Sequence, residues 1–162
     1  ASYRRALVID PARAEAHNNL GVVLDALNRH EEAVASYGSA LALQPEHAEF
    51  HCNLGYALNE LGRHQEAIAS YRRALAIQPE HAEAHYNLGN ALSKLARYEE
   101  AIASFQSALT INPGHAEAHD NLGAVLTALN RRIERRPEIS CLALEDNGSL
   151  QAALEATRST PS

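Results

Sequence analysis

Residues 48–81 read AEFHCNLGYALNELGRHQEAIASYRRALAIQPEH, and the same 34-residue pattern recurs on both sides of this stretch without insertion or deletion. Self-similarity at a fixed period of this length is typical of a repeat protein. The fourth copy, which begins at Ala116, loses the pattern after about Arg131. The predicted organisation is a second-helix half of a unit (1–13), three complete units (14–47, 48–81 and 82–115), a first-helix half of a unit (116–131) and a divergent tail (132–162).

Each unit predicts two α-helices. Leu20, Leu24 and Leu27 fall at i, i+4 and i+7, and they form one apolar stripe along the first helix. The second helix carries an equivalent stripe. A proline such as Pro45 separates each pair from the next, because proline lacks the N–H that a helix interior needs. The expected fold class is all-α.

A glycine recurs in the middle of every first helix, where it costs about 1 kcal/mol relative to alanine. Its recurrence at one register position implies a helix–helix contact so close that a side chain would clash. We expect the small residues Ala33 and Ala40, and their equivalents in the other units, to lie opposite this glycine. The glycines are Gly21, Gly55, Gly89 and Gly123.

The composition argues against several classes of protein. A net charge of −6 and a pI near 5.8 disfavour general binding to nucleic acids or to anionic membranes. No apolar run is long enough to span a membrane, and no secretory signal is found. The two cysteines, Cys52 and Cys141, have no partner pattern, so we expect a reduced, cytoplasmic setting. The lack of methionine suggests an excerpt or a processed product.

Eight positions recur in phase through the three complete units. In the first unit they are His17, Leu20, Gly21, Leu24, Ala33, Tyr37, Ala40 and Pro45. These letters resemble the signature of the tetratricopeptide repeat (TPR) family over residues 1 to about 131. The resemblance implies a right-handed α-solenoid of stacked antiparallel helix pairs, with a concave groove lined by the first helix of each unit.

Histidine occupies the position where this family usually has tryptophan or another aromatic residue. The resemblance implies that His17, His51, His85 and His119 fill space between helices. His47, His81 and His115 precede the next first helix and are expected at or near its N-cap. Pairs such as His81 and His85 have the spacing of two zinc ligands on one helix face. Two ligands are too few for a protein zinc site, so we expect no metal and no cofactor.

Asparagine recurs at the sixth position of every first helix, at Asn19, Asn53, Asn87 and Asn121. An amide carries both a donor and an acceptor, so a column of them can bind the backbone of an extended peptide without demanding particular side chains. The column resembles, more narrowly, the TPR arm of O-linked N-acetylglucosamine transferases and their SPINDLY-type relatives. The alternative is that these amides cap or bridge neighbouring helices.

Further groove positions follow from the family resemblance. TPR co-chaperones that hold acidic C-terminal tails use lysine and arginine at several of these positions, whereas Lys94 is the only such candidate here. The groove therefore favours neutral or basic extended segments. Besides the asparagines, the predicted peptide-binding residues are Glu15, Glu49, Glu83, Tyr56, Tyr86 and Asn90.

These observations predict a non-catalytic scaffold that binds an extended peptide or a partner helix of another protein. Neither a phosphate-binding glycine loop nor a plausible Ser/His/Asp set is found in the sequence. Two alternatives stay open. One is a substrate-recognition arm excerpted from a larger O-linked N-acetylglucosamine transferase-like glycosyltransferase. The other is self-assembly through apolar ends of the solenoid.

The charged positions outside the groove lead to two further expectations. The paired arginines Arg72 and Arg73, like Arg4 and Arg5, should lie on the outer, solvated side. Arg135 would occupy the small alanine position if the repeat continued, so no normal second helix is expected there. A short amphipathic helix near 149–157 is predicted to cover the end of the solenoid.

Overall fold

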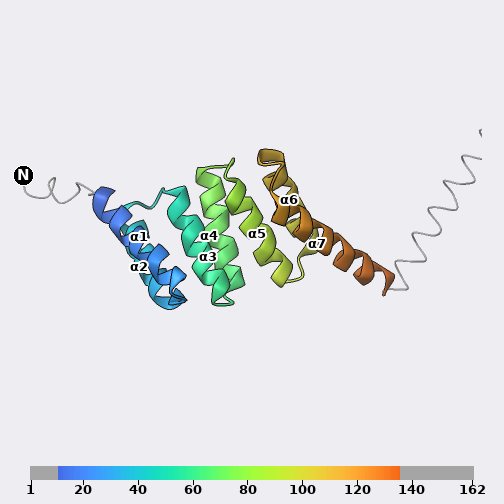
Figure 1. The fold of residues 1–162 in the computed structure, drawn as a ribbon, viewed down its shortest axis with the longest axis horizontal. Coiled ribbons are helices and arrows are strands. Elements are labelled where there is room, and N and C mark those ends of the chain that lie inside the picture. The colour runs from blue at the N-terminus through green and yellow to red at the C-terminus, as the bar shows by residue number, and fades with distance from the viewer. Residues whose placement is uncertain (1–10, 136–162) are drawn as a thin grey trace, which may run out of the picture. The chain divides into compact units, whose positions relative to one another are not determined.

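The computed structural model describes residues 11–135, and these residues are helical apart from short turns (Figure 1). No strand occurs among them, so the predicted all-α class is confirmed. The described residues fall into two units that meet inside the last helix, between Val125 and Leu126. The helices are α1 (Pro11–Ala26), α2 (His30–Leu43), α3 (Ala48–Glu60), α4 (His64–Ile77), α5 (Ala82–Lys94), α6 (Tyr98–Ile111) and α7 (Ala116–Glu134).

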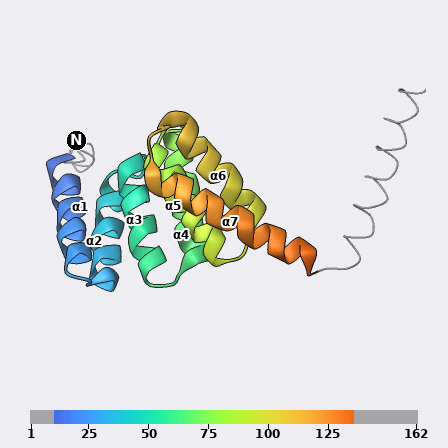
Figure 2. The same cartoon turned by 45° about the vertical axis from the view of Figure 1, so that its right-hand side comes forward.

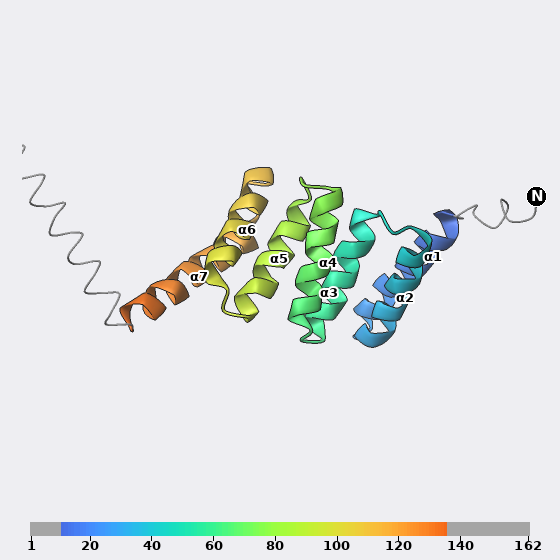
Figure 3. The same ribbon diagram turned by 180° about the vertical axis from the view of Figure 1, so that it is seen from behind.

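Consecutive helices pack against each other along the first unit. Helices α1 and α2, α3 and α4, and α5 and α6 form pairs, and α2 and α4 each also contact the first helix of the next pair (Figures 1 and 2). The backbone of α3 lies close to those of both α1 and α5, whereas the backbones of α2, α4 and α6 do not approach one another in this way. The first helices α1, α3 and α5 therefore form one row, called the inner row below, and the second helices form the other, called the outer row. Figure 3 shows the same helices from behind.

A buried aromatic ring lies against the recurring glycine of each pair. A Cβ atom built on Gly55 would lie only 2.7 Å from a ring carbon of Tyr71, a contact that no ordinary Cβ makes. The same distance is 2.5 Å between Gly21 and Tyr37 and 2.6 Å between Gly89 and Phe105. The three rings are at most 1% exposed.

The prediction of a close approach is thus confirmed, but the residue expected opposite the glycine was wrong. Ala33 and Ala40 are both fully buried, and they lie about one turn before and after Tyr37 on α2. Their small side chains let the two helices come together, and the ring between them fills the space above the glycine.

The turn inside each helix pair contains one residue with left-handed backbone. These residues are Asn28 (φ 57°), Gly62 (φ 74°) and Ala96 (φ 55°). Asparagine and glycine tolerate this conformation, whereas alanine is strained in it by roughly 1–2 kcal/mol. The turn of the third pair therefore contains a residue that disfavours the backbone conformation it adopts there.

The histidines tie the connections between pairs to the first helices. His47 and His81 are the N-cap residues of α3 and α5, as predicted. His51 Nε2 donates to the carbonyl oxygen of Pro45 at 2.7 Å, so the partly buried ring binds the turn before α3, a contact that the sequence did not predict. Imidazole is polar, and it finds an acceptor in the turn. The equivalent contacts join His85 to Pro79 and His119 to Pro113, both at 2.9 Å.

Helix α7 differs from the other first helices in length. It runs for 19 residues, against 13 in α3 and in α5, and continues to Glu134 through the register where the other pairs turn back. Arg135 is exposed at its end, in keeping with the expectation that no normal second helix begins there. The capping helix predicted near 149–157 lies outside the described residues.

Substituting alanine for glycine at two equivalent positions tests the glycine–ring contact. Gly55→Ala should destabilise the protein by about 1–3 kcal/mol, because the new methyl group overpacks the contact with Tyr71. Gly123→Ala is the matched control: its Cβ meets no described atom within 4 Å, and alanine is the better helix former by about 1 kcal/mol. Urea unfolding of both variants measures the difference, and equal effects would contradict the placement of Gly55.

The strained turn predicts a stabilising substitution. Ala96→Gly should raise the free energy of unfolding by roughly 1 kcal/mol, because glycine adopts the left-handed conformation without a Cβ clash. The reciprocal change Gly62→Ala should lower it by a similar amount. Thermal and urea unfolding check both signs, and a destabilised Ala96→Gly protein would refute strain at this turn.

Candidate peptide-binding groove

The inner row of helices carries a polar depression. It has a volume of about 490 Å³ and opens between α3, α5 and the first part of α7. Its size lies within the range of about 300–1,000 Å³ that is usual for ligand sites. Its lining is mainly polar, and all of it belongs to the first unit: Asn59, Glu60, Asn90, Ser93, Lys94, Asn121, Ala124 and Val125.

The asparagine column makes contacts between neighbouring pairs of helices. Asn53 Nδ2 donates to Asn18 Oδ1 at 3.0 Å, from α3 to the preceding first helix. Asn121 Nδ2 donates to Asn90 Oδ1 at 2.8 Å and lies 3.3 Å from the Tyr86 hydroxyl. Asn53 thus donates one of its two side-chain N–H groups and Asn121 both of them to neighbouring helices, which is the bridging role considered as the alternative.

Asn87 shares this contact with the preceding first helix, whereas Asn19 is exposed. Asn87 Nδ2 donates to Glu83 Oε1 at 3.2 Å within its own helix, and the Asn87 side chain also hydrogen-bonds to Cys52 on α3. Three members of the column, Asn53, Asn87 and Asn121, therefore bridge to the preceding first helix, and Asn19 on α1 is exposed.

The fifth position is covered in α1, α3 and α5, whereas its equivalent in α7, Asp120, is exposed. Asn18 and Cys52 are each 5% exposed. Tyr86 is partly buried, with its ring centroid 4.5 Å from that of His115 and 6.0 Å from that of Phe105. Of these residues only Tyr86 was a predicted peptide-binding residue, and it contacts neighbouring helices.

The predicted glutamates lie on the exposed surface of the first helices. Glu15, Glu49 and Glu83 are exposed, and the last two lie in the first turn of their helices, where a carboxylate favours the helix dipole. Glu83 also lies 3.9 Å from His115 Nε2. With Glu60 and a single lysine, Lys94, the inner row is acidic.

Tyr56 provides an apolar surface in the inner row. Its side chain is 44% exposed, and Val22, one unit earlier at the same position, is 47% exposed. Partial burial, followed by the charges of Glu60 and Asp25, raises the pKa of the Tyr56 hydroxyl. The ring is thus the largest exposed side chain of this helix face and has carboxylates nearby.

Sequence reasoning missed a largely buried polar cluster between α1 and α2. The Asp25 carboxylate lies 2.9 Å from His30 Nδ1 and accepts a hydrogen bond from the Tyr37 hydroxyl at 2.8 Å. Burial and this bond raise the pKa of Tyr37 well above its usual range. In the next pair Asn59 and His64 repeat the contact at 2.8 Å. An acidic or amide residue five positions before histidine, found in two units, was the available signal.

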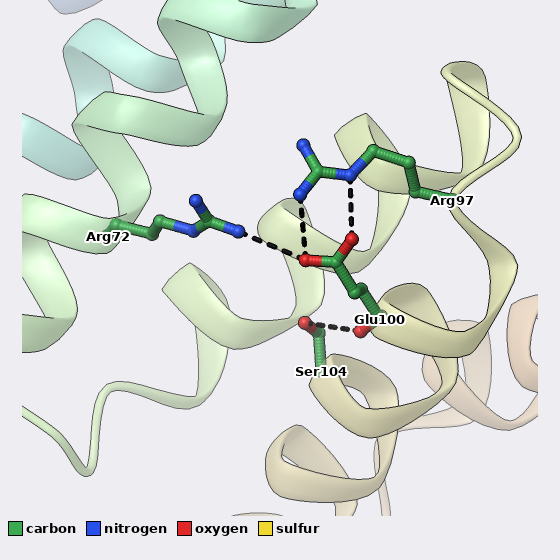
Figure 4. Close-up of polar contacts among 4 residues, drawn as sticks. All are labelled: Arg72, Arg97, Glu100 and Ser104. Atoms are coloured by element: carbon green, nitrogen blue, oxygen red, sulfur yellow. Dashed lines mark hydrogen bonds and ion pairs between the residues drawn. The ribbon is translucent and has the colours of Figure 1, made fainter.

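The outer row carries ion pairs that join neighbouring helix pairs. Arg72 on α4 lies 3.1 Å from the Glu100 carboxylate on α6, which also binds Arg97 at 2.7 Å (Figure 4). Arg73 pairs with Glu46 in the turn before α3. The hydrogen bond from Arg97 lowers the pKa of Glu100. Arg72 and Arg73 are exposed, as predicted, but both also form ion pairs with glutamates of neighbouring repeats.

Two searches of residues 11–135 gave no further site. No group of three or more His, Cys, Asp or Glu side chains there is arranged to hold a metal ion. None of the helices in this part of the chain is both long and apolar enough to cross a membrane.

Comparisons with known proteins were made for the sequence and for the fold. The sequence profile described as TPR repeat matches residues 26–62 and 55–96, and profiles described as tetratricopeptide repeat match residues 82–115 and 2–35. A search of curated proteins finds no match.

Solved structures of similar fold include three TPR domains. The Arabidopsis OM64 TPR domain is 26% identical, with a TM-score of 0.72 over 73% of this chain and 98% of that one. The first TPR of Spaghetti (RPAP3), bound to the HSP90 peptide SRMEEVD, is 22% identical with a TM-score of 0.73 over 75% and 96%. The second TPR domain of human RPAP3, in complex with the HSP70 peptide SGPTIEEVD, is 21% identical with a TM-score of 0.69 over 72% and 98%.

The thiol in the inner row should be unreactive. Burial raises the pKa of Cys52 to about 12, so the folded protein keeps this thiol protonated at pH 8.5, whereas the unfolded chain ionises it in part. Alkylation of Cys52 by iodoacetamide should be at least about tenfold slower in the native protein than in urea. Mass spectrometry of the Cys52 peptide measures both rates, and equal rates would contradict its burial.

Proposed function

Because the chain belongs to the tetratricopeptide repeat family, we propose that its inner row of helices binds an extended peptide segment of a partner protein. TPR domains are in general peptide-binding modules without catalytic activity, so the proposal assigns binding and no reaction. The observation that carries it is the polar depression of about 490 Å³ on the inner row. Its amide groups suit the donors and acceptors of a peptide backbone.

The charge of the groove favours a neutral or basic partner. Exposed carboxylates at Glu49, Glu60 and Glu83 surround the inner row, and Lys94 is the one cationic residue among the described groove positions. The similar domains of RPAP3 were solved with peptides that end in the acidic sequence EEVD. Such a peptide would meet like charges here, so we propose a different ligand class from theirs.

The asparagine column gives a second candidate function. A substrate-recognition arm of an O-linked N-acetylglucosamine transferase-like glycosyltransferase would use the same column, and Asn19 retains an exposed amide for it. The discriminating observation is the parent reading frame. A transferase would continue into a catalytic domain of several hundred residues, and a frame without one would remove this candidate.

Self-association is a third candidate, favoured by one face of α1. Leu20, Val23 and Leu27 are 50%, 55% and 59% exposed there, and stacking of solenoid ends would cover such a face. Light scattering at increasing protein concentration tests it, and a constant monomer mass would exclude it.

As the location we propose the cytoplasm, because Cys52 is a buried free thiol.

A charge-sorted peptide screen tests the main proposal. Ten-residue peptides are immobilised in basic, neutral and acidic pools, with SRMEEVD as an acidic reference. Binders should come from the basic and neutral pools, and the reference should bind at least about tenfold more weakly at low salt, because it meets the groove carboxylates. Isothermal titration of the selected peptides measures the ratio.

Two charge-matched variants serve as controls for this screen. Glu49→Lys/Glu60→Lys changes the inner row and should abolish the preference for basic peptides. Glu31→Lys/Glu99→Lys changes the outer helices by the same net charge and should retain it. A wild-type protein that binds no peptide, or a preference that survives the inner-row variant, would refute the proposal.

A further inference from the structure

The depression on the inner row lies where the ninth position of the first helix carries no aromatic ring. The ninth position of the first helix is Tyr56 in α3, Asn90 in α5 and Ala124 in α7. Asn90 and Ala124 both line the depression, whereas Tyr56 does not. The step from a large ring to smaller side chains therefore opens a space at one level of the stack.

Two amides in this space are held in a fixed mutual orientation. Asn121 Nδ2 donates to Asn90 Oδ1 at 2.8 Å, and the Tyr86 hydroxyl accepts from the same nitrogen at 3.3 Å. The remaining groups are the Oδ1 acceptor of Asn121 and the Nδ2 donor of Asn90. Neither makes a hydrogen bond to any residue in 11–135. A neighbouring acceptor and donor of this kind match the donor and acceptor of one carboxamide.

Further polar groups in the lining point to a neutral ligand. The Ser93 hydroxyl is buried, and within the described part of the chain it has no hydrogen-bond partner. Glu60 and Lys94 stand in the same lining with opposite charges, and neither forms an ion pair with another described residue. The two opposite charges give the lining no net charge, so it does not favour a carboxylate or an ammonium group over a neutral polar side chain.

We propose that this depression is a specificity pocket for a glutamine or asparagine side chain of the bound peptide. The Asn121 carbonyl accepts from the ligand NH₂ group, and the Asn90 NH₂ group donates to the ligand carbonyl. The pocket rests on the proposed peptide-binding function and adds to it the identity of one side chain. The ligand backbone lies along the inner row.

Side-chain replacement in the selected peptides tests the pocket. Each peptide that the wild-type protein binds is resynthesised with every glutamine or asparagine replaced in turn by leucine, glutamate or lysine. One position should be selective: all three replacements there should raise the Kd about tenfold or more, because each leaves Asn90 and Asn121 without an amide partner.

Substitution at the ninth position supplies the matched variants. Asn90→Tyr restores the residue of the preceding unit and should fill the pocket, so that glutamine and leucine peptides bind equally while binding itself persists. Tyr56→Asn is the control on the neighbouring helix and should leave the selective position unchanged. Circular dichroism checks that both variants are folded.

The outcomes separate this proposal from the function on which it rests. Peptides that bind without any glutamine or asparagine dependence, or a dependence that Asn90→Tyr leaves intact, would overturn the pocket and leave the peptide-binding function standing. A wild-type protein that binds no peptide would overturn both.

Discussion

The contact between one glycine and one aromatic ring in each helix pair determines the spacing of the whole stack. The ring carbons of Tyr71 leave no room for a Cβ on Gly55, so the two helices are as close as their backbones and one ring permit. Three buried pairs of this kind repeat the same geometry. Because every unit adopts the same spacing, consecutive first helices come into contact and form a continuous inner row.

Polar side chains then join the pairs without filling the core. His51 reaches the carbonyl of the turn that precedes its helix, Asn53 bridges to the preceding unit, and Arg72 spans two outer helices. Each contact lies at a boundary between repeats. The groove is therefore a surface whose polar groups are partly committed to the fold, and only the uncommitted groups can bind a ligand.

The period, the helix pairs and the N-cap histidines could be predicted because each depends on local sequence alone. The partner of the glycine could not, since the ring and its flanking alanines lie on the same helix face and only the packing decides which of them meets Gly21. The bond between Asp25 and His30 was missed because it closes across a turn. The amide pair of Asn90 and Asn121 depends on the spacing between units, which no single repeat encodes.

Differences between repeats at one position carry more functional information than the repeat itself. Positions that hold the same residue type in every unit, such as the glycine at Gly55, keep the distance between the two helices of a pair the same from unit to unit. The ninth position changes from Val22 to Tyr56, Asn90 and Ala124 while the backbone around it stays the same. A side chain that varies on a constant backbone changes the shape and chemistry of the groove at that level alone. Selectivity in a solenoid of equal units can therefore arise one position at a time, without any change in the stack.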